Sequence, residues 1–320
     1  MTALADTIAA QPALLEPVLA LDLGDALTRI EPARRLWLVG TGSSQHAAEL
    51  GAWMFGTGER EARWSSSATF ASSDRSLGSD DAVVIISHTT ETAFARRARA
   101  RALAAGARVV SITGQGRGWP EAVQTVEAER SETYTASYLS ALIVLARLSA
   151  ALGQAGFDER QLSALPAQID AAARAPVALS APPRRLIVLA GAGPAAVTAR
   201  EGAVKLREAA RLPAEGFEAE YLLHGSAVPL GSDDALLAIQ PGDDRFGLLR
   251  LLVGTAASEG LTVAAVEEPE GLDPVLAQIP LTVRLQKLAS ELADARGMNA
   301  DKVIVDGWED DRLWRAGDPG

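Results

Sequence analysis

Short runs of apolar residues, rich in Val, Ile and Leu, recur along the chain and are separated by stretches with helical spacing. Each run is typical of a buried β-strand, and each stretch is typical of a helix with one apolar face. The expected strands lie just before Gly40 and over residues 81–87, 108–113, 123–126, 186–190, 235–239 and 261–265. The expected helices cover the first thirty residues and 91–105, 194–211, 245–259 and 284–297, with a further helix ending near Gly153. This alternation predicts an α/β fold whose parallel sheets are covered by helices on both faces.

Two segments of the chain, about 150 residues apart, follow the same pattern. One reads RRLWLVGTGSSQHAAE and the other RRLIVLAGAGPAAVTARE. In both, an apolar strand runs into a Gly-x-Gly turn and then into an Ala-rich helix. Gly40 and Gly42 correspond to Gly191 and Gly193 at an offset of 151. A repeat of this length predicts two similar domains.

The repeat also predicts where the domains begin and end. We expect a helical segment over residues 1–30, a first domain over 31–155, a second domain over 170–301 and a C-terminal tail over 302–320. The Ala- and Pro-rich stretch 164–183 is the expected linker. The last fifteen residues are acidic and broken by Gly and Pro, which predicts an aperiodic, frayed tail.

The composition is that of an ordinary globular chain, 48% hydrophobic and 22% charged. A net charge of −11 argues against nucleic-acid binding, because proteins that bind phosphate backbones carry a basic face. The chain has no cysteine, which excludes disulfides, cysteine-ligated metals and thiol nucleophiles. Neither a signal peptide nor a membrane-spanning stretch is expected, because the N-terminus lacks a basic start and the apolar runs are short. We therefore expect a soluble, cytoplasmic protein.

Two hydroxyl-rich turns follow strands that are expected to be neighbours. They read Thr41-Gly-Ser-Ser44 and Ser87-His-Thr-Thr-Glu-Thr92. Hydroxyls, free backbone amides and a helix N-terminus together suit a phosphate monoester. The alternative is that Ser87, Thr89 and Thr90 are only helix N-caps, and for one isolated turn that explanation would be preferred. Two such turns on adjacent strands favour a phosphate site.

Two other ligand classes are not supported by these residues. The Gly40-Thr-Gly42 turn has Gln45 where a dinucleotide-binding fingerprint has its third glycine. The chain has three histidines, His46, His88 and His224, and no two of them have the i,i+4 spacing of a helical metal site. We predict neither nucleotide binding nor a metal site.

The expected helix 194–211 contains the segment Glu201-Gly-Ala-Val-Lys-Leu-Arg-Glu208, which carries a candidate acid–base pair. Lys205 and Glu208 are three residues apart and share a helix face. Such pairs are most often solvated ion pairs. The functional alternative is that Glu208 removes a proton from a carbon acid, with Lys205 and His224 nearby.

These motifs together resemble the sugar isomerase (SIS) domain family, over residues of about 30–301. The tandem arrangement is similar to the isomerase region of glucosamine-6-phosphate synthase and to fructosamine-6-phosphate deglycases. In that family the two hydroxyl-rich turns bind the sugar phosphate. The resemblance implies this role for the residues at the matching positions, which are Ser44, Ser87, His88, Thr89 and Thr92. His88 stands in the place of a glutamine, and Thr90 in the place of a glycine, which changes the turn's backbone requirements.

The second half matches a family helix followed, sixteen residues after its last Glu, by a His-Gly turn. By resemblance, Glu208 is the base that moves a proton between C1 and C2, His224 opens the sugar ring, and Lys205 helps to hold the substrate. The family's terminal lysine segment is replaced here by Lys302-Val-Ile-Val-Asp306, and Lys302 lies too early for that role. The sugar-contacting run also departs, with Tyr134-Thr-Ala136 at that place.

The resemblance implies two tandem three-layer αβα SIS domains with parallel five-stranded, flavodoxin-like sheets. It implies an enzyme that isomerises, deaminates or deglycates an amino-sugar or fructosamine 6-phosphate through an enediol or enolamine, without a cofactor. It also implies a homodimer, and a site formed across the domain cleft or between subunits. The alternative, suggested by the missing lysine segment, is a sugar-phosphate-binding protein without catalysis.

Overall fold

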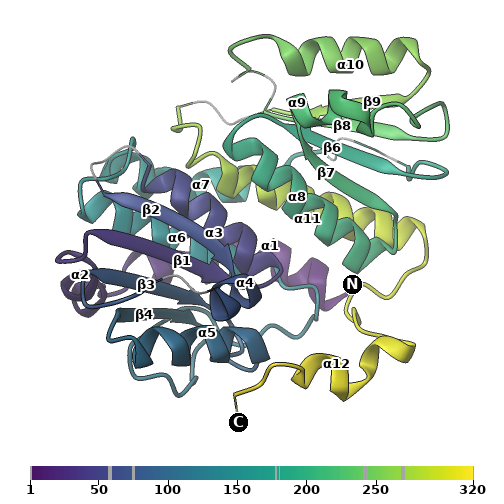
Figure 1. The fold of residues 1–320 in the computed structure, drawn as a ribbon. Coiled ribbons are helices and arrows are strands. Elements are labelled where there is room, and N and C mark those ends of the chain that lie inside the picture. Colours follow the sequence, from purple (N-terminus) through teal and green to yellow (C-terminus); the bar gives the residue numbers. More distant parts are fainter. Residues whose placement is uncertain are drawn as a thin grey trace. The chain divides into compact units, whose positions relative to one another are not determined.

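The computed structural model describes residues 2–56, 60–73, 76–176, 179, 181–240, 242, 244–267 and 271–319. The chain divides into two compact units, each built around one sheet. The five-stranded unit comprises Ala13–Glu129, Ala136–Ser163 and Ile304–Gly320. The four-stranded unit comprises Met1–Pro12, Arg130–Thr135 and Ala164–Val303. Figure 1 shows the strands and helices of both units.

The five-stranded sheet is parallel throughout, with the strand order β2-β1-β3-β4-β5. Its strands are β1 (Arg35–Gly40), β2 (Glu61–Ser66), β3 (Asp81–Ile86), β4 (Arg108–Thr113) and β5 (Ala122–Gln124). This order is that of flavodoxin-like sheets, in which ligands bind outside the carboxyl ends of the strands. In the register, Gly40 lies opposite Ser66, and Val39 lies opposite Ile85. The carboxyl ends of the three strands therefore meet at one edge.

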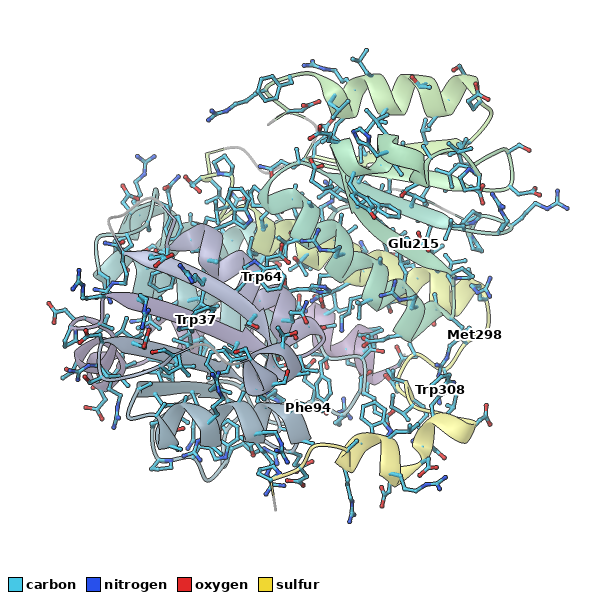
Figure 2. The ribbon with its side chains drawn as sticks, viewed as in Figure 1. Trp37, Trp64, Phe94, Glu215, Met298 and Trp308 are labelled. Atoms are coloured by element: carbon cyan, nitrogen blue, oxygen red, sulfur yellow. The ribbon has the colours of Figure 1, made fainter. Side chains whose placement is uncertain are left out.

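Helices cover both faces of this sheet. They are α2 (Gly24–Ile30), α3 (Ser43–Met54), α4 (Ser67–Ser72), α5 (Ala93–Ala104) and α6 (Ala136–Ala151). On one face Gly51 of α3 lies so close to Leu38 of β1 and Leu145 of α6 that an added Cβ would come within 2.9 Å of both. On the other face Trp37, labelled in Figure 2, packs edge-on against Phe70 of α4 and belongs to the core that α5 completes. The unit has three layers.

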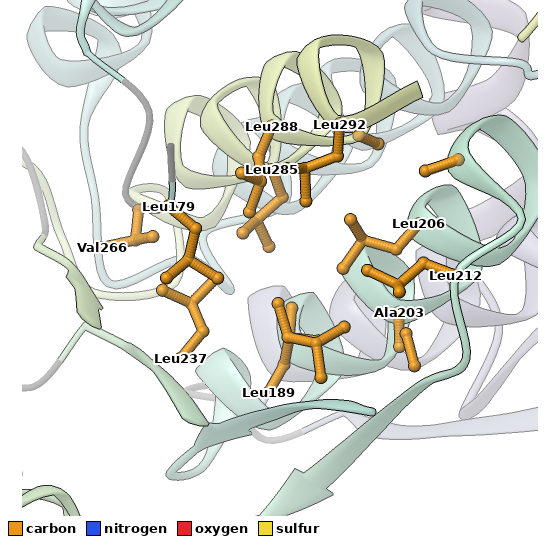
Figure 3. Packing of buried hydrophobic residues seen from close by; sticks show 14 of the residues in the cluster. Leu179, Leu189, Ala203, Leu206, Leu212, Leu237, Val266, Leu285, Leu288 and Leu292 are labelled. Carbon is orange, nitrogen blue, oxygen red and sulfur yellow. The ribbon is translucent and has the colours of Figure 1, made fainter. Parts of the chain in front are cut away.

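The four-stranded sheet is also parallel, with the order β7-β6-β8-β9. Its strands are β6 (Ile187–Gly191), β7 (Ala214–Glu218), β8 (Ala235–Ile239) and β9 (Thr262–Val266). The helices that pack on it are α8 (Pro194–Ala210), α9 (Ala219–Tyr221), α10 (Leu248–Ser258) and α11 (Gln278–Ala295). Figure 3 shows Leu189 and Leu237 of the sheet packed with Leu206 of α8 and Leu285 of α11.

Specific contacts recur in the two units. Gly202 of α8 lies between Leu189 and Leu285, where an added Cβ would come within 2.9 and 2.6 Å of their side chains, as Gly51 lies between its own two leucines. In each unit an arginine at the start of the first strand (Arg35) or two residues before it (Arg185) binds a buried aspartate. Arg35 Nε lies 2.6 Å from Asp81, and Arg185 Nε lies 2.8 Å from Asp234. The parallel α/β construction predicted from the apolar pattern is confirmed in both sheets.

The second sheet has four strands in the described part of the chain, so the predicted five-stranded sheet is wrong for this unit. The chain between β4 and α6, residues 114–135, has room for β5. The corresponding connection from β9 to α11, residues 267–277, is half as long. It leads directly into α11, which begins six residues earlier than its periodicity predicted.

Two strands were not expected from the apolar pattern. They are β2 and β7, the edge strands that pair with β1 and β6. Their sequences, Glu-Ala-Arg-Trp-Ser-Ser and Ala-Glu-Gly-Phe-Glu, lack the apolar runs of the central strands. An edge strand pairs on one side only and carries polar side chains toward water, so it gives no continuous apolar signal. All the strands that were expected are present.

The C-terminal segment is ordered against α5, in contrast to the expected frayed tail. It contains a 3₁₀ turn (Asp306–Glu309) and the short helix α12 (Asp311–Arg315). Arg96 of α5 pairs with Asp318 at 2.6 Å. Gly317 has a φ of +82° and lies against the ring of Phe94, which Figure 2 labels. These contacts fix the segment where composition alone predicted no structure.

The remaining helices are α1 (Ala3–Leu19) and α7 (Glu159–Arg174), and α7 begins before the stretch expected to be a linker. Within the described residues, no single helix is long and apolar enough to cross a membrane. The pair formed by α1 and α2 reaches the required length and composition only when joined, and it is bent by 68°.

Candidate functional site

The first Gly-x-Gly turn joins β1 to α3 and presents hydroxyls at the start of that helix. An added Cβ at Gly40 would lie 2.2 Å from the carbonyl oxygen of Ser44, so only glycine lets the helix start this close to the strand. Gly42 caps α3 with a φ of +60° and offers no side chain to its first amides. Ser43 and Ser44 form the first turn of the helix. Helix amides and serine hydroxyls are thus placed where an anion can bind.

The second turn begins at Ser87, directly after β3. Ser87 is 4% exposed, and its backbone N–H donates to the carbonyl of Ile112. Its Oγ is buried and has no hydrogen-bond partner among the described residues. A buried hydroxyl without a partner is unfavourable, and native proteins rarely keep one without a reason. A bound ligand oxygen would satisfy it.

The threonines that follow are not ordinary N-caps. Thr89 Oγ1 accepts the N–H of Glu91 at 3.2 Å, inside the turn itself. The residue that caps α5 is Thr92, and its side chain makes no capping hydrogen bond. The N-cap explanation for Ser87, Thr89 and Thr90 is therefore wrong, because none of the three is the cap. The N-terminal amides of α5 keep their capacity to bind an anion.

Thr90, which stands where the resembling family motif has a glycine, has a left-handed backbone conformation. Its φ is +62°, in the left-handed region that β-branched residues rarely adopt. Its Oγ1 donates to the carbonyl of Thr89 at 2.6 Å. The turn keeps its shape at the cost of backbone strain.

His88 is held against the end of β4. Its carbonyl accepts the N–H of Gly114, and an added Cβ at Gly114 would lie 2.7 Å from its ring. Burial lowers the pKa of His88 below its ordinary value. The negative charge of Glu129 opposes this shift, and the positive charge of Arg117 adds to it. The imidazole is therefore neutral at pH 7 in the ligand-free protein.

Because β1 and β3 are neighbours, the two turns lie at one edge of the five-stranded sheet. The structure thus brings together the predicted phosphate-binding residues, which are Ser44, Ser87, His88, Thr89 and Thr92. A third hydroxyl-bearing segment, Ser65 to Ser67, ends β2 at the same edge. Ser67 Oγ is buried and has no partner in the described structure. The apolar pattern gave no sign of strand β2, so this segment was not predicted, although its three consecutive serines are a signal in the sequence.

The matching edge of the four-stranded sheet has the same backbone without the hydroxyls. An added Cβ at Gly191 would lie 2.4 Å from the carbonyl oxygen of Ala195, and Gly193 has a φ of +54°. The residues that follow are Pro194 and Ala195. Pro194 has no N–H to offer an anion.

A closed polar network occupies that edge. Thr198 donates to Gln278 Oε1 at 2.7 Å, and Gln278 Nε2 donates both to Gln240 Oε1 and to the carbonyl of Pro274. Thr198, Gln240 and Gln278 are all buried. Gln240 directly follows β8, as Ser87 directly follows β3, and has a φ of +54°. Here the polar groups satisfy one another.

The candidate acid–base pair lies in the last three turns of α8, away from that edge. Lys205 is 1% exposed, and its Nζ donates to Glu208 Oε2 at 2.7 Å. Glu201 Oε1 lies 3.6 Å from the same Nζ, and its side chain is fully buried. Glu208 is 26% exposed. The interpretation of Lys205 and Glu208 as a solvated ion pair is wrong, because the lysine has almost no contact with water.

His224 is not brought to this pair within the chain. It lies in a π-helical turn (Leu222–Ser226) with a non-helical backbone, followed by Gly225 at a φ of +103°. Its side chain is 74% exposed, and its Nε2 lies 4.0 Å from Glu220 Oε1. Lys205 and Glu208 are thus close together, and His224 is presented to the surface.

The described residues contain no group of three or more His, Asp or Glu side chains arranged to hold a metal ion. Lys302, which stands near the family's lysine segment, pairs with Glu132 at 3.3 Å. The backbone beside it is fixed by a hydrogen bond from Glu132 N–H to the carbonyl of Asp301. The Tyr134 segment and the Lys302 segment therefore lie side by side within the four-stranded unit.

Residues 29–119 match the model of the SIS domain family. This match confirms the resemblance drawn from the two hydroxyl-rich turns, both of which lie inside it. Among curated proteins, the chain is 26% identical over 319 residues to glutamine–fructose-6-phosphate aminotransferase (isomerizing) of Chlorobaculum tepidum, which covers 87% of this chain and 51% of that protein. It is also 26% identical over 341 residues to the protein of the same name from Gloeobacter violaceus, covering 91% and 56%. The chain spans about half the length of these relatives.

Solved structures show the same fold. Glucosamine-6-phosphate deaminase from Thermotoga maritima superposes with a TM-score of 0.76 at 18% identity, over 94% of this chain and 97% of that one. Tagatose-6-phosphate ketose/aldose isomerase from Escherichia coli superposes with a TM-score of 0.72 at 16% identity, over 96% and 98%. The C-terminal domain of glucosamine-fructose-6-phosphate aminotransferase from Francisella tularensis gives 0.75 at 15%, over 94% and 98%.

Proposed function

We propose that the chain consists of two tandem SIS domains and is an enzyme that acts on a phosphorylated amino sugar, ketose or glycated amine. The reaction is an isomerisation, deamination or deglycation that passes through an enediol or enolamine. Similarity to proteins named as an isomerizing aminotransferase, a deaminase and a ketose/aldose isomerase supports this substrate class. A cytoplasmic location and a homodimer stay predictions, as do the domain boundaries drawn from the repeat.

The phosphate group of the substrate is assigned to the five-stranded unit. Ser44, Ser87, Thr89 and Thr92 supply hydroxyl and amide donors, and His88 lines the turn. The unpartnered Oγ of Ser87 supports this assignment, because a phosphate oxygen provides the acceptor that the folded chain does not. The edge is suited to a dianion, since helix N-termini and neutral donors surround it.

The chemistry is assigned to the four-stranded unit, and one observation carries it: Glu208 is a partly exposed carboxylate bound to a buried ammonium. Lys205 Nζ donates to Glu208 Oε2 at 2.7 Å and so fixes the position of the carboxylate, and a positioned carboxylate can act as a general base. Glu208 takes the proton from the substrate carbon next to the carbonyl, the electron pair of that C–H bond forms a C=C bond, and the π pair of the carbonyl moves to its oxygen. His224 assists opening of the sugar ring, as the family resemblance implies.

A second candidate function is sugar-phosphate binding without turnover. It is favoured by the position of His224, whose ring lies beside Glu220 and does not contact the Lys205–Glu208 pair within the chain. A binding protein, however, gives no reason to keep a buried lysine against a partly exposed carboxylate.

The experiment that separates the two is proton NMR in D₂O with a panel of hexose, hexosamine and fructosamine 6-phosphates. An enzyme of the proposed kind incorporates deuterium at C1 or C2 of its substrate, and the product identifies the reaction. Tight binding of a sugar phosphate with no incorporation would establish the binding protein instead. Neither binding nor incorporation with any member of the panel would contradict both.

A further inference from the structure

Three charged side chains follow one face of α8 at the spacing i, i+4, i+7. They are Glu201, Lys205 and Glu208, and their exposed fractions run from 0% through 1% to 26%. Glu208 is therefore the member that substrate can reach. Glu201 and Lys205 are buried and can influence the substrate only through Glu208.

The cluster holds two carboxylates for one ammonium. Removing a carboxylate from water is costly unless a cation compensates it, so a fully buried Glu201 requires its neighbour Lys205. Lys205 Nζ lies 2.7 Å from Glu208 and 3.6 Å from Glu201, so before reaction Glu208 is the closer counter-ion. The second carboxylate is not needed to neutralise Lys205 in this state.

The need for it arises during the reaction. When Glu208 accepts the substrate proton it becomes neutral, and its attraction for the buried ammonium is lost. Without a second carboxylate, the state after proton transfer would lack the negative charge of both Glu201 and Glu208 beside the buried ammonium of Lys205. With Glu201 present, the ammonium keeps a counter-ion, and the cluster changes from a net charge of −1 to zero.

We propose that Glu201 is a positioning residue that serves as the counter-ion of Lys205 while Glu208 carries the substrate proton. In the step itself the C–H bond beside the carbonyl breaks, an O–H bond forms on Glu208, the C–H electron pair forms a C=C bond, and the π pair of the carbonyl moves onto the substrate oxygen. Glu201 exchanges no proton and does not touch the substrate. This role rests on the proposed function.

The test compares Glu201→Gln and Glu201→Asp with the parent enzyme, using deuterium incorporation into the sugar phosphate that the parent turns over. The glutamine keeps the size of the side chain and removes its charge, so kcat falls by about tenfold or more, while KM changes by less than about threefold. The aspartate keeps the charge, so it restores most of the lost kcat. Melting temperatures are measured alongside. A merely structural role would lower the stability of both variants and would not produce this difference in kcat between them.

Thr198→Val is the matched control. It also removes a buried polar group from α8, one turn before Glu201, but its hydrogen bond runs to Gln278 and not to Lys205. It is expected to lower the melting temperature and leave kcat unchanged. If the parent exchanges deuterium and Glu201→Gln does so equally fast, the function stands and the counter-ion role is overturned. Equal losses of kcat in folded Glu201→Gln and Glu201→Asp would also overturn the counter-ion role. If the parent incorporates deuterium into none of the sugar phosphates, the proposed function is contradicted together with it.

Discussion

The two Gly-x-Gly turns share a backbone and differ in what their side chains leave unsatisfied. Gly42 and Gly193 have φ values of +60° and +54°, and in both turns the first glycine touches the backbone of the following helix. After β3 the Ser87 hydroxyl has no partner in the described structure. After β8 the Gln240 amide oxygen accepts a hydrogen bond from Gln278. We call the first the open edge, because it leaves a hydroxyl without a partner among the described residues, and the second the closed edge, because its described polar groups bind one another.

This difference between the two turns shows which residues are needed for packing and which are needed for binding. The glycines are needed in both units because the helix must start against the strand, and this requirement holds whether or not a ligand binds. Binding requires donors that the fold leaves without partners. Removing a polar group at the open edge should therefore reduce binding and leave stability intact, and removing one at the closed edge should do the reverse.

The largest effect is expected at Glu208, the proposed base in the four-stranded unit. Glu208→Gln keeps the shape of the side chain and removes the base, so turnover should fall by roughly 10²–10⁴-fold. Phosphate binding should survive, since the phosphate turns are in the other unit. Initial rates and calorimetric titration with the same sugar phosphate check both statements. Glu291→Gln, an exposed carboxylate of α11 that pairs with Lys287, is the control. Parental turnover in Glu208→Gln would remove Glu208 as the base.

At the closed edge, Gln278→Leu should lower the free energy of unfolding by about 1–3 kcal/mol, because Thr198 and Gln240 lose their partner while buried. The affinity for sugar phosphate should not change. Denaturant unfolding and calorimetry measure the two quantities. A large loss of affinity at unchanged stability would show that this edge also holds the ligand.

At the open edge, replacing Ser87 and Thr89 together by Ala should weaken sugar-phosphate affinity by roughly tenfold or more, because hydrogen bonds to a charged ligand contribute about 1.5–3 kcal/mol each. The free energy of unfolding should fall by no more than about 1 kcal/mol, since the buried Ser87 Oγ has no partner to lose and Thr89 loses only the hydrogen bond from the N–H of Glu91. Ser258→Ala, which removes a hydroxyl from α10, is the control. An unchanged affinity in the double variant contradicts the assignment of the phosphate turn.

A smaller effect is expected at Thr90. Its φ of +62° is strained for a β-branched residue and unstrained for glycine. Thr90→Gly should therefore stabilise the protein by about 1 kcal/mol, after the greater flexibility of glycine in the unfolded chain is allowed for. The melting temperature measures this change. A decrease would show that the threonine side chain contributes more than its backbone costs.

The smallest effect concerns the pH dependence of stability through His88. Its pKa is lowered, chiefly by burial, so the folded protein binds a proton less readily than the unfolded chain. The parent should then lose stability relative to His88→Gln as the pH falls below about 6.5, the ordinary histidine value. Above that pH, His88 is neutral in both states and this contribution vanishes. Parallel slopes of unfolding free energy against pH in the two proteins would contradict the effect of burial.

The sequence was sufficient for the central strands and for the hydroxyl-rich turns, because both are local features. Apolar runs identify buried parallel strands, and Ser87 follows such a run directly. The edge strand β2 gave no such signal, and the serines at its end were lost with it. The described residues give the second sheet four strands, and this number depends on the length of one connection, which periodicity does not reveal.

Other features depend on residues that are distant in sequence. Whether Ser87 Oγ finds a partner, and whether Gln240 meets Gln278, is decided only when the strands and helices pack. The spacing of Lys205 and Glu208 allowed either a solvated pair or a functional one. Burial of Lys205 excludes the solvated pair, and the functional role stays a proposal. Burial is a tertiary property that helical spacing does not contain.

The most direct test of the central claim is the position of a sugar 6-phosphate in a crystal structure of its complex with this protein. We predict that the phosphate lies at the carboxyl edge of the five-stranded sheet, with one oxygen accepting the hydroxyl of Ser87 and others bound at Ser44 and the start of α5. The edge at Gly191 should hold no ligand, with the hydrogen bonds between Thr198, Gln278 and Gln240 intact. A phosphate bound at the Gly191 turn, or one bound in the first unit without contact to Ser87, would contradict the account.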